Sequence, residues 1–126
     1  MKKKDNIMNK LRSLREELSD IETKERKKEN KKLIGKCFKY NNSYSCPENE
    51  NDYWPVYSTV LDINEDGHPI VFCFETDKYG KFECETKVKY GSMTLGTECP
   101  SNEMMASWSR QYQELSKMFE KAWEAT

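Results

Sequence analysis

The register of one predicted hairpin constrains the fold of this chain more than any other sequence feature. Residues 68–77 and 81–90 alternate apolar and polar positions on either side of a turn that ends at Gly80. A three-residue loop with Gly80 as the bulge residue gives the two strands a shared apolar face. A shorter or longer loop would set Phe72 and Phe74 against glutamates. The predicted pairs are Ile70 with Val88, Phe72 with Thr86, Phe74 with Cys84, and Thr76 with Phe82.

The same pattern predicts further strands at residues 33–40 and 55–63, with a fifth candidate at 92–95. Turn residues ending at Gly67 separate residues 55–63 from the hairpin. Alternation along the strand before that turn extends the apolar face, through Tyr57, Thr59, Leu61 and Ile63. We therefore expect a small antiparallel sheet or an SH3-like barrel of four to five strands.

A helix is predicted on each side of this β segment. In the first, apolar residues recur at intervals of four and three, which is the seam of a coiled coil, and the helix runs from about Asp5 to Lys32 with a solvated carboxyl end. A second seam follows Ser101, which we expect to cap its helix. The seam residues are Ile7, Leu11, Leu14, Leu18 and Ile21 in the first helix, and Trp108, Tyr112, Leu115 and Phe119 in the second.

The fold class is accordingly α+β in three parts, at residues 1–32, 33–99 and 100–126. The simplest arrangement pairs the two helices antiparallel, as a coiled coil that brings Ile21 near Trp108 and Leu14 near Leu115 or Phe119. A pair of helices covers each seam on one side only, so we also expect self-association through the helices, as a homodimer.

The composition of the chain indicates in which cellular compartment we expect the protein. Charged residues make up 34% of the chain, and residues 1–32 hold twelve Lys or Arg against seven Asp or Glu, whereas the remainder is acidic. No apolar run approaches the roughly 20 residues of a membrane span, and no apolar stretch follows the first lysines. We expect a cytoplasmic protein with no membrane contact, whose five cysteines remain thiols.

The sequence contains no catalytic motif, so we expect no enzyme activity and no cofactor. The cysteines lack the close spacing of a zinc site, and the only histidine, His68, lies in a turn, so we expect no metal. The basic run at residues 24–32 is diluted by glutamates. We interpret it as a solvated face rather than a nucleic-acid contact.

The aromatic connection between residues 41 and 54 is the best candidate for a binding site, because long loops in small domains often carry function. Its side chains could stack on a base or anchor a protein interface. They could equally fold inward as a lid over a small core, and the sequence leaves this open. The candidate residues are Tyr44, Tyr53, Trp54, Glu48, Glu50 and Asp52. The cation for a phosphate would be Arg110, beside Trp108 and Tyr112 in the second helix, or the lysines near residue 31.

The stretch LIGKCFKYNNSYSCPENENDYWPVY, followed by VFCFETDKYGKFECE, resembles a group of small bacteriophage and prophage proteins with a charged leading helix, a small β domain and a closing helix. The resemblance implies a counter-defence role in an infected bacterium. The expected function is inhibition of a host defence protein, for example a CRISPR nuclease, by stoichiometric binding, as anti-CRISPR proteins act. The alternatives are a sponge for a signalling nucleotide and a structural phage part.

Overall fold

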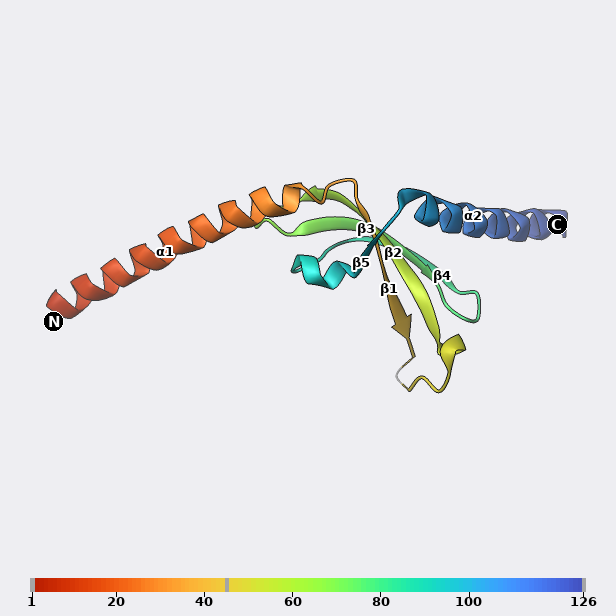
Figure 1. Ribbon diagram of the computed structural model, residues 1–126, viewed down its shortest axis with the longest axis horizontal. Coiled ribbons are helices and arrows are strands. Elements are labelled where there is room, and N and C mark those ends of the chain that lie inside the picture. The colour runs from red at the N-terminus through yellow and green to blue at the C-terminus, as the bar shows by residue number, and fades with distance from the viewer. Residues whose placement is uncertain (1, 45, 126) are drawn as a thin grey trace.

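A five-stranded antiparallel sheet forms the centre of the molecule, and a helix leaves it at each end of the chain (Figure 1). The computed structural model describes residues 2–44 and 46–125. The elements are α1 (Lys2–Lys31), β1 (Cys37–Ser43), the 3-10 turn η1 (Glu50–Asp52), β2 (Tyr53–Ile63), β3 (Pro69–Thr76), β4 (Phe82–Val88), the 3-10 turn η2 (Ser92–Leu95), β5 (Thr97–Cys99) and α2 (Ser101–Glu124).

The predicted register of the β3–β4 hairpin is confirmed at all four pairs. Gly80 has φ +82°, and the Asp77 amide donates to the Lys81 carbonyl at 3.1 Å, which closes the three-residue loop. The strand order is β4-β3-β2-β1-β5, so the sheet is open and the barrel alternative is wrong. Residues 92–95 form η2 instead of a strand, and the fifth strand is β5, which pairs with β1.

The two faces of the sheet carry separate apolar clusters. One face, which we call the helix face, holds Tyr57, Phe72, Phe74 and Phe82 with Trp108 packed against them, and the opposite face holds the cluster of Phe38, Val60, Val71 and Leu95. Ile63 was expected on the helix face but belongs to the opposite cluster. A β-bulge between Val60 and Asp62 shifts the register there, so the residues beyond it exchange faces.

Helix α2 crosses the helix face from β1 towards β4. Lys39 donates to Glu103 at 2.7 Å, and Trp108 packs edge-on against Phe72 and Phe74 at centroid distances of 5.6 and 5.2 Å. The helix begins at Ser101 with Pro100 as its N-cap, and no side chain caps it, so the predicted serine cap is wrong. Proline is tolerated at the start of a helix because its backbone nitrogen has no hydrogen to donate, and the helix requires no donor there.

The carboxyl end of α1 is docked on the β2–β3 turn, where a solvated end was expected. Asn30 is buried and donates to the Gly67 carbonyl at 2.9 Å, and Arg26 donates to the Asp66 carbonyl at 2.7 Å. Part of the basic run at residues 24–32 is therefore engaged within the chain.

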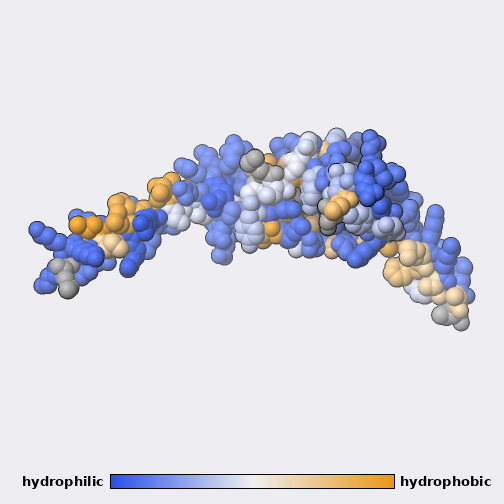
Figure 2. Space-filling view, turned by 90° about the horizontal axis from the view of Figure 1, so that it is seen from below, coloured by the Kyte–Doolittle hydropathy of each residue, from blue (hydrophilic) through white to orange (hydrophobic). Residues whose placement is uncertain are grey.

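The two helices extend in opposite directions from the sheet, so the expected antiparallel pairing of α1 with α2 is absent from the described part of this single chain (Figure 1). The α1 seam lies exposed along its whole length, with 43 to 60% of each residue accessible, and hydrophobic side chains line this helix in Figure 2. In α2, Tyr112 and Phe119 are exposed, whereas Trp108 is partly buried. Neither described helix holds an apolar stretch that could cross a membrane.

Candidate binding site

The described residues of the connection between β1 and β2 fold back onto the β3–β4 turn and form a tip at this end of the sheet. The Tyr44 ring lies 4.8 Å from the Trp54 ring and 5.9 Å from the Tyr79 ring, between centroids. The Tyr44 hydroxyl donates to the Asp77 carboxylate at 3.2 Å. An aromatic cluster of this kind immobilises a long connection, because each ring buries area at a small cost in conformational entropy.

Asp52 holds the connection in place from within. Its carboxylate accepts from the backbone amides of Glu48 at 2.8 Å and Asn49 at 3.2 Å, completes a capping box for η1, and pairs with the Lys78 ammonium. The hydrogen bond from Lys78, followed by the amide of Glu48, lowers the pKa of Asp52 to about 2. Lys78 also lies 5.3 Å from the centroids of both the Tyr44 and Tyr79 rings.

Trp54 and Tyr53 take different roles among the two that the sequence left open, which are burial in the core and exposure for binding. Trp54 is buried, and its indole N–H donates to Glu75 at 2.9 Å, where Asn42 also donates at 3.1 Å. Tyr53 is 49% exposed and Tyr79 is 79% exposed at the same end of the sheet. Trp54 is therefore part of the core, and the exposed aromatic residues here are Tyr53 and Tyr79.

The acidic candidate residues of this connection are likewise of two kinds, exposed and buried. Glu48 and Glu50 are exposed, whereas Asp52 is buried and paired. We define the tip surface as Glu48, Glu50, Tyr53 and Tyr79. Tyr79 was not among the residues predicted from the sequence, because it lies in the neighbouring hairpin turn. An aromatic residue at an exposed turn position is nevertheless an indication of a binding surface.

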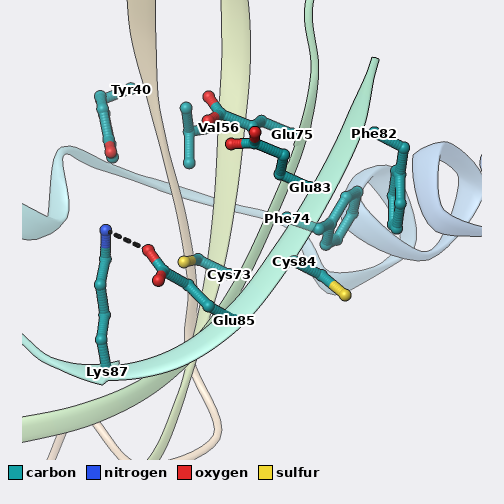
Figure 3. A pocket seen from close by; sticks show the side chains of 10 residues that line it. All are labelled: Tyr40, Val56, Cys73, Phe74, Glu75, Phe82, Glu83, Cys84, Glu85 and Lys87. Carbon is teal, nitrogen blue, oxygen red and sulfur yellow. Dashed lines mark ion pairs between the residues drawn. The ribbon is translucent and has the colours of Figure 1, made fainter. Parts of the chain in front are cut away.

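A cavity of about 410 Å³ lies on the opposite face, between β1 and β4 (Figure 3). Its floor includes Cys73, whose pKa is raised by burial, and its rim includes Glu83, Glu85 and Lys87. Glu85 and Lys87 form an ion pair at 3.0 Å.

Arg110 lies on the opposite side of the sheet from Trp54. It is exposed on α2 and lines a cavity of about 230 Å³ with Tyr57, Phe74 and Thr76, on the helix face. Trp54, by contrast, shares the opposite face with Glu75. The predicted cation and Trp54 therefore do not share one binding surface.

The cysteines are free thiols in several environments. Cys37 and Cys99 are buried and directly opposite each other across β1 and β5, whereas Cys46 and Cys84 are exposed. Within the described residues, no three His, Cys, Asp or Glu side chains gather as they would around a metal ion.

Comparison with known proteins adds no relative. No protein family, curated protein or solved structure matches this chain.

Proposed function

We propose that the protein is a non-enzymatic binding protein that acts stoichiometrically on another protein, with the tip surface as its contact. The observation that carries this proposal is the set of contacts that joins the tip to the β3–β4 turn. Asp52, Lys78 and the ring of Tyr44 hold the connection against the β3–β4 turn, while Tyr53 and Tyr79 remain exposed.

A preorganised surface of this kind favours protein binding, because little conformational freedom is lost when the complex forms. Exposed tyrosines are frequent energetic centres of interfaces. Aromatic anchors beside exposed carboxylates would also select a basic partner by charge complementarity.

The proposed partner is a bacterial defence effector, with a CRISPR nuclease as the example. Glu48 and Glu50 flank the tip, and the chain from residue 33 onward carries fifteen Asp or Glu against nine Lys or Arg. Such a surface would compete with nucleic acid for a positively charged channel. The proposed setting is the cytoplasm of the infected bacterium.

A nucleotide sponge has weaker support from the geometry. The cation nearest the tip rings is Lys78, and it is already paired with Asp52. Arg110 lies on the other face, with Tyr57 as the neighbouring aromatic residue. The remaining alternative, a structural phage part, predicts neither effector inhibition nor a nucleotide response.

The test is inhibition of target-DNA cleavage by a panel of purified CRISPR nucleases, each loaded with guide RNA. We expect the wild-type chain to inhibit at least one of them at an equimolar ratio. Tyr53→Ala combined with Tyr79→Ala should raise the inhibitory concentration at least about tenfold, the loss expected when an interface anchor is removed.

The matched control is Tyr90→Ala, because Tyr90 is about as exposed as Tyr79 but lies beyond the far end of β4. This variant should inhibit like wild type. Full inhibition by the folded double variant would contradict the tip assignment. A chain that inhibits no nuclease but melts at a higher temperature with millimolar cyclic nucleotides would favour the sponge.

A further inference from the structure

Strand β4 is a free edge of the sheet. It lies at one end of the strand order and runs over seven residues, Phe82–Val88. The Asp77 amide donates to Lys81 and the Lys89 amide donates to Pro69, so odd-numbered residues exchange backbone hydrogen bonds with β3. The backbone N–H and C=O groups of the even-numbered residues therefore point outward, where another strand could bind.

The side chains along this edge follow a charge pattern that complements itself. Glu83, Glu85 and Lys87 line the cavity on the opposite face (Figure 3), and Lys89 lies on the same face, 5.0 Å from the centroid of the Tyr40 ring. Two acidic positions are thus followed by two basic positions on one face, and Lys81 precedes them and pairs with Glu83 at 3.1 Å. An antiparallel copy of the strand presents the same charges in reverse order.

The direction of the backbone groups restricts the register of such a pair. Because even-numbered residues point outward on both copies, they must face even-numbered residues. Centring the pair on Thr86 sets Glu85 opposite Lys87 and Glu83 opposite Lys89, twice each. Every other centre between Glu83 and Lys89 sets at least one like-charge pair face to face, which is destabilising.

We propose that two copies of this chain pair through their β4 edges, antiparallel about a two-fold axis at Thr86, into one continuous ten-stranded sheet. The four Glu–Lys pairs occupy the non-hydrogen-bonded positions, where side chains of opposing strands come closest. On the helix face, Cys84 lies opposite Val88 of the other copy. The paired edge is symmetric, as in most homodimers.

The course of α2 supports the same pairing independently. Trp108 packs against Phe82, the first residue of β4, and the helix continues past it with Tyr112 and Phe119 exposed. Figure 1 shows this second half projecting away from the sheet. In the proposed dimer it extends over the helix face of the other copy.

That face has an unfilled apolar groove beside α2. It measures about 380 Å³ and is lined by Leu61, Phe72, Met105 and Trp108 among others. Two apolar surfaces, the projecting half of α2 and this groove, are thereby brought together by one symmetry axis. The pairing does not use the tip surface and does not depend on the proposed function.

Sedimentation of the full chain with reversed charges tests the pairing. We expect a wild-type dimer that weakens as salt is added. Glu83→Lys with Glu85→Lys, or Lys87→Glu with Lys89→Glu, gives only like-charge pairs, and each double variant should raise the dissociation constant at least about tenfold. An equimolar mixture of the two double variants should form a heterodimer.

The control for this experiment is Leu14→Asp with Leu18→Asp, which alters the α1 seam and should leave the β4 dimer intact. A wild-type chain that sediments as a monomer at about 100 µM would overturn the proposal, since an obligate edge pair should be tighter than this. So would a dimer that survives both charge reversals but is lost in the α1 variant.

A spin label at position 86 tests the register. In a background of Cys46→Ser and Cys84→Ser, the exposed thiols are removed, and Thr86→Cys places two labels next to the axis. We expect strong dipolar broadening that disappears on dilution with unlabelled chain. The matched control, Thr97→Cys in the other edge strand, should show none, and equal broadening at both positions, or none at 86 in a dimer, would overturn the assigned axis.

Discussion

At the scale of single residues, adjacent side chains of the same type have opposite roles. Tyr53 and Trp54 are neighbours in β2, but successive residues of a strand point to opposite faces. Trp54 enters the cluster with Tyr44 and Glu75, whereas Tyr53 faces solvent. Asp52, the residue before them, is the polar centre that fixes their connection.

Replacing Asp52 should reveal this role through pH. Its pKa in the folded protein is about 2, below the ordinary 3.8, so its charge stabilises the fold above pH 3.8 and this contribution is lost as the pH falls through about 2. Asp52→Asn should melt at a lower temperature than wild type at neutral pH. The difference should shrink as the pH is lowered through that window.

Thermal melts followed by circular dichroism measure the effect, with Glu50→Gln as the control. Glu50 is an exposed carboxylate of the same connection, and its replacement should leave the melting curve unchanged at every pH. A constant difference between Asp52→Asn and wild type at all pH values would contradict the role of the charge.

At the scale of elements, the docking of α1 depends on one glycine. Gly67 has φ +86°, and a Cβ atom there would lie 3.0 Å from the Lys27 amide nitrogen and 3.1 Å from the Arg26 Cβ atom. The β2–β3 turn can approach the helix this closely because glycine has no side chain. Asn30 and Arg26 then bond to the carbonyls of the turn.

Alanine at Gly67 should therefore separate α1 from the sheet. Gly80→Ala is a matched control, because Gly80 has a similar φ of +82° but nothing within 4 Å of its added Cβ atom. Both variants carry backbone strain, and Gly67→Ala should cost about 1–3 kcal/mol more in the free energy of unfolding, as overpacking does. Equal losses in urea titrations of the two variants would contradict the contact.

At the scale of the whole molecule, the sheet is a platform from which two helices project in opposite directions (Figure 1). Pairing through β4 would use one edge of the platform and the projecting half of α2. The α1 seam would remain exposed for another helix. Self-association through that seam stays a prediction, and two different two-fold contacts in one chain would build assemblies larger than a dimer.

The variant Leu14→Asp with Leu18→Asp separates the two contacts. Both leucines are more than half exposed, so the free energy of unfolding should change by no more than about 0.5 kcal/mol at low protein concentration. If the seam binds a second α1, the sedimentation mass should fall to that of the β4 dimer. An unchanged mass would show that α1 does not mediate self-association.

The local parts of the fold were predictable from sequence because they depend on local patterns. Alternation and one turn glycine were enough for the β3–β4 register, and the spacing of the seams was enough for the two helices. The bulge at Val60 and the short strand β5 were not predictable in this way. Each depends on which distant segment supplies the neighbouring backbone, and three residues carry too little pattern to indicate a strand.

The candidate site was predicted in part for the same reason. Sequence identified the aromatic connection but could not separate Trp54 from Tyr53, since their burial depends on where the β3–β4 turn lies. Tyr79 and Lys78 complete the tip from a turn more than twenty residues away. Arg110 was predicted as a phosphate-binding cation beside Trp108 and Tyr112, and α2 carries it across the face opposite to Trp54.

The sequence by itself determined the two helices, the four longer strands, the β3–β4 register, the apolar seams and the order of charges along β4, because each is set by neighbours within a few residues. Only the tertiary structure decided that the helices diverge, that β4 is an unpaired edge and that Trp54 is core. Those outcomes depend on the course of the chain between elements. Burial depends on which surfaces pack together, so it cannot be read from the sequence of a single segment.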